Sequence, residues 1–269
     1  MIIYYPCFGQ VPSYSGSSMD DYLRDSVAHR KDVEGLCHTY RKALYTNVRF
    51  LDEKRLCKCI LPCTALSVVK ILEHAGAYAD EWAVGRRLEG KVVTVINRSE
   101  IVGRPLAAML ANDGADVFSV DIDSIYRFRD GRMIVCDETA EACVRKSDIV
   151  VCGVPVKSYK LPTAWVKENS YVVNVSHFSN VHEEELLKVP GVKFVGMVGK
   201  VTVAMLERNL CRLHSQYHRD SLNSLNNSAN QQLANVHLKQ TLVLSAIAAV
   251  AATTSLAILA AAKLSKNAK

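Results

Sequence analysis

Several features that mark common classes of binding protein are missing from this sequence. The 33 basic and 27 acidic residues are interspersed, and no Lys/Arg stripe carries interleaved aromatic residues. The net charge of +6 therefore does not indicate a nucleic-acid partner. Cys57, Cys59 and Cys63 lack a second pair at zinc-ligand spacing, so we expect no metal site. No Ser/His/Asp or Cys/His arrangement predicts nucleophilic catalysis.

The cysteine usage indicates a reducing compartment. Nine cysteines are an odd number, and the first residues do not have the pattern of a secretory signal peptide. Free thiols fit this usage better than a disulfide framework, so we expect a cytoplasmic protein whose cysteines act as small buried hydrophobic residues. With 269 residues, 49% of them hydrophobic, the chain is long enough for two modest domains or for one domain with appendages.

The most informative stretch of the sequence lies between residues 91 and 121. The apolar run 92–96 predicts a buried strand, and a polar turn then leads to Gly103 and Pro105, where a helix over 105–112 begins. A second strand, 115–120, follows. Further compact apolar runs at 149–152 and 171–175 suit a sheet covered on both faces. The sequence therefore predicts an α/β fold with a Rossmann-like parallel sheet.

A strand, a turn, a helix and a second strand ending on an acid form the arrangement that holds a dinucleotide. Backbone N–H groups at the helix start face the diphosphate, and a carboxylate about 20 residues on accepts hydrogen bonds from the ribose hydroxyls. Asp121 ends the second strand here, and Asp123 is the alternative for this role. The turn contains one glycine instead of the three of the GxGxxG pattern, so an ordinary βα crossover is the competing interpretation.

The composition changes near the end of the chain. Residues 215–240, which include the Ser-, Asn- and Gln-rich run 220–235, predict a flexible linker. Residues 241–262 carry no charge and are long enough to cross a bilayer, although their many alanines and the central Thr253-Thr254-Ser255 weaken the signal. We expect a C-terminal transmembrane helix that anchors the protein to a membrane. An Ala-rich helix packed on protein is the alternative.

Five motifs occur together in the order found in one enzyme family. They are Lys31 to Gly35, Leu61 to Thr64, Val95 to Pro105, Cys152 to Pro155 and Gly199 to Leu206, and the resemblance that they carry covers about residues 2 to 213. In these motifs the chain resembles the methylenetetrahydrofolate dehydrogenases, and most closely their fungal monofunctional NAD-dependent branch. The resemblance implies an oxidoreductase of one-carbon metabolism and purine biosynthesis. Such an enzyme oxidises 5,10-methylenetetrahydrofolate to 5,10-methenyltetrahydrofolate and passes the hydride to NAD.

The resemblance also implies roles for individual residues. The residues implied to bind the cofactor are Arg98, Ser99, Gly103, Asp121, Ile122, Gly153, Val154, Pro155 and Thr202, and those implied to bind the folate are Tyr4, Pro6 and Asp32. No catalytic acid or base is assigned, because hydride transfer needs orientation and exclusion of water. A carboxylate at Asp121 accepts hydrogen bonds from a 2′-hydroxyl and repels a 2′-phosphate, which favours NAD over NADP. The guanidinium of Arg98 could instead pair with a 2′-phosphate.

The resemblance divides the chain into parts. Residues 1–75 correspond to a remnant of the folate-binding domain, 76–200 to the NAD-binding domain and 201–214 to a helix that returns to the substrate domain. The family has a long preceding segment that builds most of the folate-binding domain. We therefore expect that domain to be incomplete, and the chain as given to bind NAD with slow or no turnover.

Three further expectations concern activity and partners. Bifunctional members use a Tyr-x-x-x-Lys motif for the cyclohydrolase step, and no tyrosine here is followed by lysine four residues later, so we expect no cyclohydrolase activity. We expect a homodimer that binds a folate substrate. The alternative functions are a membrane-tethered, catalytically inactive NAD-binding module and another Rossmann-type dehydrogenase acting on a small acid.

Overall fold

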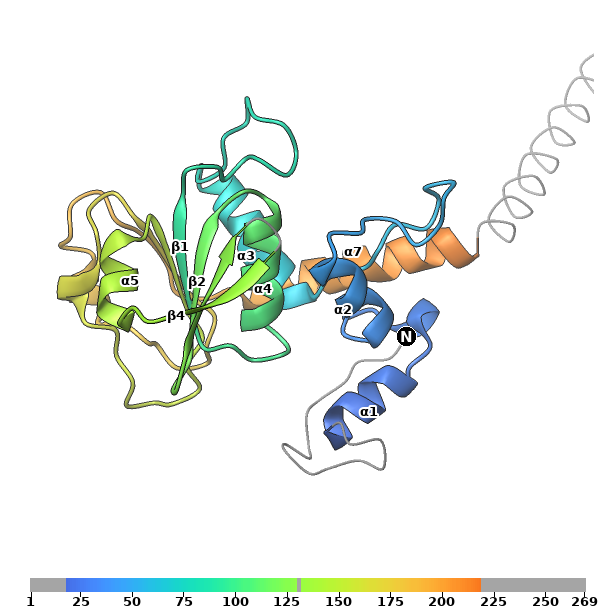
Figure 1. Cartoon of the computed structure of the whole chain (residues 1–269), viewed down its shortest axis with the longest axis horizontal. Coiled ribbons are helices and arrows are strands. Elements are labelled where there is room, and N and C mark those ends of the chain that lie inside the picture. Colours follow the sequence, from blue (N-terminus) through green and yellow to red (C-terminus); the bar gives the residue numbers. More distant parts are fainter. Residues whose placement is uncertain (1–17, 130–131, 219–269) are drawn as a thin grey trace, which may run out of the picture. The chain divides into compact units, whose positions relative to one another are not determined.

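The structure is a computed structural model and describes residues 18–129 and 132–218 (Figure 1). The described residues up to Tyr217 cluster as one compact unit, and the sheet and helices below belong to it. The strands are β1 (Val92–Ile96), β2 (Asp116–Val120), β3 (Ile125–Arg129), β4 (Arg132–Cys136), β5 (Ile149–Cys152), β6 (Tyr171–Asn174) and β7 (Lys193–Val195). The helices are α1 (Met19–Ser26), α2 (His38–Tyr45), α3 (Cys63–His74), α4 (Gly103–Asn112), α5 (Ala140–Lys146), α6 (Glu183–Leu186) and α7 (Gly199–Tyr217).

The strands form one seven-stranded sheet in the order β4-β3-β2-β1-β5-β6-β7. Strands β2, β1, β5, β6 and β7 pair in parallel, as predicted. Strand β3 is antiparallel to β2, and β4 is antiparallel to β3. The sheet is therefore mixed, and the prediction of a parallel sheet is correct only for its centre. The hairpin was not predicted: β3 mixes apolar and charged residues, and the apolar run 133–136 of β4 was overlooked, although the structure leaves Met133, Ile134 and Val135 exposed.

Helices cover both faces of the sheet, with α3 and α4 on one side and α5 on the other (Figure 1). Alternate residues of β1 point to opposite faces: Val93 and Val95 pack with Leu106 and Leu110 of α4, and Ile96 packs in the cluster that contains Val144 of α5. This burial on both faces explains why the central strands β1 and β5 consist of nearly uninterrupted apolar residues. Each fully buried aliphatic side chain contributes about 1.5–3 kcal/mol of transfer free energy.

A third, smaller core lies outside the sheet, where α7 contacts the segment around α2. It contains Val33, Tyr40, Cys59, Ile60 and Leu213, all of them buried. Helix α7 extends from Gly199 to Tyr217, beyond both ends of the predicted 201–214, and it also packs along α3. The helix thereby connects the sheet region with the segment 29–63.

Three predictions fall on residues outside the described ranges. These are the folate-binding residues Tyr4 and Pro6, almost all of the linker 215–240, and the C-terminal hydrophobic helix 241–262. Within residues 18–129 and 132–218, no helix is long and apolar enough to cross a membrane. The same residues contain no group of three or more His, Cys, Asp or Glu side chains placed to hold a metal ion.

Candidate cofactor and substrate site

The strand order reverses direction at β1, which pairs with β2 on one side and with β5 on the other. In doubly wound sheets, ligands bind outside the carboxyl ends of the strands at such a switch point. The segments that leave β1, β2 and β5 at this edge carry eight of the residues predicted to bind a cofactor. They are Arg98, Ser99 and Gly103 after β1, Asp121 and Ile122 after β2, and Gly153, Val154 and Pro155 after β5.

The turn between β1 and α4 is held close to the start of the helix. Asn97 adopts a left-handed backbone conformation with φ of 87°, and its N–H donates to the carbonyl of Val120 over 2.9 Å. A Cβ atom placed on Gly103 would lie 1.8 Å from the carbonyl oxygen of Asn97. Glycine is therefore required at position 103 because the helix start touches the turn, although Gly103 does not itself have a positive φ.

Ser99 closes the first turn of α4. Its Oγ accepts the N–H groups of Val102 at 3.2 Å and Gly103 at 3.3 Å, and its own N–H donates to Asn97 Oδ1 at 2.9 Å. The sequence predicted that N–H groups at this helix start face a diphosphate. In the structure two of them already have a hydroxyl partner, and Ser99 itself is exposed at the edge of the site.

The side chain of Arg98 is fixed against the end of β2. Its Nε donates to Ser119 Oγ (3.1 Å), Nη1 donates to Ser124 Oγ (3.0 Å), and Nη2 donates to the carbonyl oxygens of Ser119 (2.9 Å) and Ser124 (2.7 Å). The guanidinium also lies 4.3 Å from the ring centroid of Tyr126. These contacts hold the guanidinium beside the short loop that carries Asp121.

The loop after β2 presents Asp121 and Ile122 at the edge of the site. The N–H of Asp121 donates to the carbonyl of Ser124 over 3.0 Å, and Asp121 Oδ1 accepts the N–H of Ile122 over 2.9 Å. Asp121 is half-buried, and Ile122 is 94% exposed. A second oxygen of the Asp121 carboxylate therefore remains available to a ligand, next to an exposed apolar side chain.

The segment after β5 lies directly beside the turn after β1. The N–H of Gly153 donates to the carbonyl of Ile96 over 3.0 Å, and a Cβ on Gly153 would lie 3.0 Å from Val175 and 3.9 Å from Asn97 Cβ. Asn180, which is completely buried, binds both backbone groups of Val154: its Oδ1 accepts the N–H (2.9 Å) and its Nδ2 donates to the carbonyl (3.0 Å). Sequence reasoning missed Asn180, since no local pattern distinguishes it.

A pocket of about 100 Å³ gathers residues from four of the five motifs. It is lined by Glu34, Leu36, Pro62, Cys63, Thr64, Ile101, Thr202, Val203 and Leu206. Ile101 belongs to the turn after β1, so the pocket connects that turn with the segment 34–64 and with α7. Thr202 donates a hydrogen bond to Ser67 Oγ of α3 over 3.1 Å, which fixes the start of α7 at the pocket.

Asp32 is buried, with 5% of its surface exposed, and its carboxylate stabilises the loop that leads into α2. Oδ1 accepts the N–H groups of Glu34 (3.1 Å) and Gly35 (2.9 Å), and Oδ2 accepts the N–H of Cys37 (2.8 Å). Asp32 does not line the pocket, whereas Glu34, two residues later in the same motif, does. Sequence reasoning overlooked Glu34, and only its place in the motif could have indicated it.

Asn209 of α7 ties together the backbone of the segments that form the pocket. Its Nδ2 donates to the carbonyl oxygens of Val33 and Leu61, both at 2.9 Å, and lies 3.4 Å from Cys63 Sγ. Burial, followed by the negative charge of Glu34, raises the pKa of Cys63 to about 12. The thiol of Cys63 therefore stays protonated and donates to the carbonyl of Val33 over 3.4 Å. Cys63 is a packing residue with a weak hydrogen bond, not a nucleophile.

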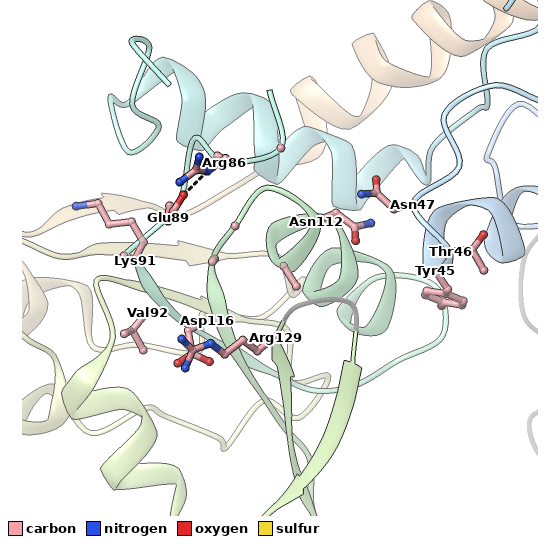
Figure 2. Close-up of a pocket in the computed structure, with 15 residues that line it drawn as sticks. Tyr45, Thr46, Asn47, Arg86, Glu89, Lys91, Val92, Asn112, Asp116 and Arg129 are labelled. Atoms are coloured by element: carbon pink, nitrogen blue, oxygen red, sulfur yellow. Dashed lines mark hydrogen bonds and ion pairs between the residues drawn. The ribbon is translucent and has the colours of Figure 1, made fainter. Parts of the chain in front are cut away.

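A second hollow, of about 850 Å³, lies at the opposite end of the sheet (Figure 2). Its lining includes Lys91 and Val92 at the start of β1, Asp116 at the start of β2, and Arg129 at the end of the antiparallel β3. None of the residues that the sequence predicted to bind cofactor or folate lines it. The motifs therefore indicate the small pocket at the carboxyl edge as the functional site.

The family profile described as tetrahydrofolate dehydrogenase/cyclohydrolase, NAD(P)-binding domain, matches residues 62–218. The chain belongs to this family. It is 45% identical over 223 residues to the methylenetetrahydrofolate dehydrogenase [NAD(+)] of Dictyostelium discoideum, an alignment that covers 79% of this chain and 67% of that protein.

Solved structures of the family share the fold. The NAD-dependent 5,10-methylenetetrahydrofolate dehydrogenase of Saccharomyces cerevisiae superposes with a TM-score of 0.72 at 42% identity, covering 81% of this chain and 70% of that one. The bifunctional FolD methylenetetrahydrofolate dehydrogenase/cyclohydrolase of Campylobacter jejuni superposes with a TM-score of 0.55 at 27% identity, over 74% of this chain and 62% of that one. The resemblance expected from the five motifs is thus confirmed, as is the likeness to the NAD-dependent fungal branch.

Proposed function

We propose that this protein is an NAD-dependent dehydrogenase that oxidises 5,10-methylenetetrahydrofolate to 5,10-methenyltetrahydrofolate in one-carbon metabolism. The observation that carries the proposal is the pocket formed by Glu34, Thr64, Ile101 and Thr202, which adjoins the turn after β1 at the switch point of the sheet. The relatives that share more than 40% identity with the chain are named for this reaction and for NAD.

The residues at the carboxyl edge fit a dinucleotide. We infer that Asp121 accepts hydrogen bonds from the adenosine ribose, with Ile122 beside the adenosine, and that Arg98, Ser99 and Gly103 line the approach to the ribose and diphosphate. Gly153, Val154 and Pro155 would lie along the cofactor because their turn adjoins that of Asn97. Thr202 would lie near the nicotinamide, at the pocket.

The contacts of Arg98 favour NAD over NADP. A guanidinium can bind a 2′-phosphate through a pair of N–H groups, but in Arg98 all three nitrogens already donate to Ser119 and Ser124. Asp121 places a negative charge at the same edge, and a carboxylate repels a phosphate. These contacts support NAD over the alternative that Arg98 left open in the sequence.

For the folate we propose the pocket beside Thr202, with Glu34 as the acidic group that faces it. Asp32 would act by shaping the Glu34 loop, since its two oxygens are bound to three backbone N–H groups. Tyr4 and Pro6 stay predictions for the folate ring. We assign residues 1–75 to the folate-binding part, 76–200 to the NAD-binding domain and 201–214 to the helix that joins them.

The chain's contribution to the reaction is orientation and exclusion of water. NAD, when bound, supplies the hydride acceptor, so the protein needs no strong acid or base. Leu36, Pro62, Val203 and Leu206 give the pocket an apolar lining, and Ile101 places the turn after β1 at its wall. We propose no cyclohydrolase activity, because no tyrosine is followed by lysine four residues later.

We also propose that the protein works in the reducing environment of the cytosol and forms a homodimer that pairs through the edge strand β4. Val135 of this strand is 67% exposed and Ile134 is 55% exposed, and an exposed apolar edge is a ready site for strand pairing. All eight cysteines within the described residues are free. Sedimentation of Ile134→Lys against the unaltered chain tests the dimer, which the charged variant should dissociate.

The test of the proposed function is NAD binding by the full chain, by calorimetry, with Asp121→Ser as the decisive variant. Hydrogen bonds to a carboxylate contribute about 1.5–3 kcal/mol. Their loss should raise the Kd for NAD about tenfold or more and narrow the preference for NAD over NADP. Asp123→Ser is the matched control and should leave the Kd for NAD unchanged. A full chain that does not bind NAD, or a larger effect at Asp123, would contradict the assignment.

A further inference from the structure

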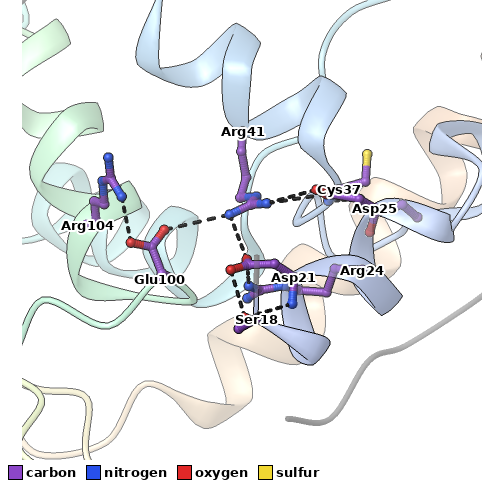
Figure 3. A network of polar contacts seen from close by, with 9 residues as sticks. Ser18, Asp21, Arg24, Asp25, Cys37, Arg41, Glu100 and Arg104 are labelled. Carbon is purple, nitrogen blue, oxygen red and sulfur yellow. Dashed lines mark hydrogen bonds and ion pairs between the residues drawn. The ribbon is translucent and has the colours of Figure 1, made fainter. Parts of the chain in front are cut away.

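A chain of ion pairs connects the segment 18–45 with the turn after β1 (Figure 3). Its centre is Arg41 of α2, whose side chain is 13% exposed. Arg41 Nη1 lies 3.3 Å from Asp21 Oδ1, and Arg41 Nη2 lies 3.3 Å from Asp25 Oδ1, so the guanidinium holds α1 against α2. Asp21 also pairs with Arg24 of its own helix.

The same guanidinium reaches the turn after β1. Arg41 Nη1 lies 3.7 Å from Glu100 Oε2, and Glu100 Oε1 accepts a hydrogen bond from Arg104 Nη1 of α4 over 2.6 Å. The Arg104 guanidinium lies 5.1 Å from the ring centroid of Tyr45, the last residue of α2. Glu100 therefore lies between two arginines: the pair with Arg41 links the turn directly to α2, and the pair with Arg104 links it to α4, whose Arg104 in turn contacts Tyr45 of α2.

Each residue of this turn contacts a different part of the molecule. Arg98 binds the end of β2, Ser99 caps α4, Glu100 binds α2, and Ile101 lines the substrate pocket. Because Glu100 lies between Ser99 and Ile101, its position determines where the cofactor edge and the pocket wall stand relative to each other. Its partner Arg41 belongs to α2, in the part assigned to folate binding.

We infer that Arg41 is a positioning residue: through Glu100 it fixes the turn after β1 to α1 and α2, and so sets the affinity for NAD. This inference rests on the proposed function. An exposed ion pair contributes little, because water screens it and two long side chains lose freedom. Arg41 differs from such a pair because it is largely buried and contacts three carboxylates, so its guanidinium cannot simply turn to solvent.

A purely structural interpretation of the network is that Arg41 only holds α1 to α2. Asp25→Asn separates the two, because it removes one contact to α1 and leaves Glu100 in place. Under the inference, Asp25→Asn keeps the Kd for NAD unchanged. Under the purely structural interpretation, Asp25→Asn and Glu100→Gln lower the melting temperature and neither changes the Kd for NAD.

The experiment measures the Kd for NAD and the melting temperature of the full chain and its variants. Arg41→Gln and Glu100→Gln should each raise the Kd about threefold to fivefold, the double variant should be no worse than the single ones, and Arg41→Lys should recover part of the loss. Glu141→Gln is the matched control, since it breaks the exposed Glu141–Arg145 pair of α5 (2.8 Å), which touches neither the turn nor α2.

The outcomes are distinct. An unchanged Kd in Arg41→Gln and Glu100→Gln, or losses that simply add in the double variant, would overturn the inference and leave the proposed function standing. If Arg41→Gln is unstable, the near-isosteric Glu100→Gln decides alone. A full chain without affinity for NAD would overturn the proposed function and this inference with it.

Discussion

Replacing Gly103 by alanine is the most direct test of how the turn after β1 is built. Helix propensity alone predicts stabilisation, since alanine is favoured over glycine by about 1 kcal/mol in a helix. The structure predicts the opposite. The added Cβ would lie 1.8 Å from the carbonyl oxygen of Asn97, where an ordinary carbon–oxygen contact is roughly 3.3 Å or longer. The turn or the helix start must therefore move by about 1.5 Å.

The size of the effect follows from that displacement. Overpacking at a buried position costs about 1–3 kcal/mol, which exceeds the gain in helix propensity. In a chain of this size each kilocalorie lowers the melting temperature by about 2–4 °C, so a fall of several degrees is expected. A shift of the turn by more than an ångström also moves Ser99 and Ile101, and misplacement on that scale can cost about 100-fold in a positioned step. The Kd for NAD should rise at least tenfold.

The assay pairs thermal unfolding with NAD calorimetry, and Gly199→Ala is the control. Gly199 also starts a helix, but a Cβ there meets no atom within 4 Å, so this variant should be as stable as the unaltered chain or slightly more stable. If Gly103→Ala matches Gly199→Ala in both melting temperature and Kd, the close contact with Asn97 does not restrict this position, and the account of the turn is wrong.

Three further predictions concern other parts of the site. Glu34→Gln should weaken folate binding severalfold and leave the Kd for NAD unchanged, because Glu34 lines the pocket and not the cofactor edge; equal losses for both ligands would contradict this. Asn209→Leu should lower stability by about 1–3 kcal/mol, because the carbonyl groups of Val33 and Leu61 lose a buried donor, and urea unfolding measures the change. Burial raises the pKa of Asp148, but its bonds to Lys167 and to the N–H of Val92 lower this pKa more. The ionised Asp148 therefore stabilises the folded protein fully above about pH 4, and this stabilisation is lost as the pH falls further. Asp148→Asn should flatten the acid limb of the curve of unfolding free energy against pH.

The centre of the fold could be predicted because burial on both faces leaves a local signature. Strand β5 consists of apolar residues and β1 is apolar apart from Thr94, so their bounds of 92–96 and 149–152 matched the runs predicted from the sequence. The hairpin of β3 and β4 lies at the sheet edge, and although β4 contains the apolar run 133–136, this run is largely exposed. Its residues are largely half-buried or exposed, and the pattern IYRFR is as compatible with a polar connection as with a strand.

The site could be predicted only as far as its motifs extend. Motif order correctly brought the segment 31–35, the turn 62–64 and the start of α7 into one place, but it could not show which side chain faces the pocket. Asp32 turns inward to bind its own loop, and Glu34 faces the pocket instead. Asn209 contacts Val33 across 176 residues of sequence, and a contact between such distant residues leaves no trace in either local pattern.

The single glycine of the turn after β1, which made the sequence a poor match to GxGxxG, is explained by what each glycine of that pattern does. One glycine permits a tight turn, one lets the backbone approach the diphosphate, and one allows the helix to pack closely. Here Asn97 adopts the positive φ of the tight turn, and Gly103 provides the close packing. The remaining role, close approach of the backbone to the diphosphate, corresponds to the position of Ser99, whose hydroxyl accepts two N–H groups at the helix start. A dinucleotide bound at this turn would therefore meet the Ser99 side chain in place of a bare backbone, so the conformations that the pattern requires can be met with one glycine.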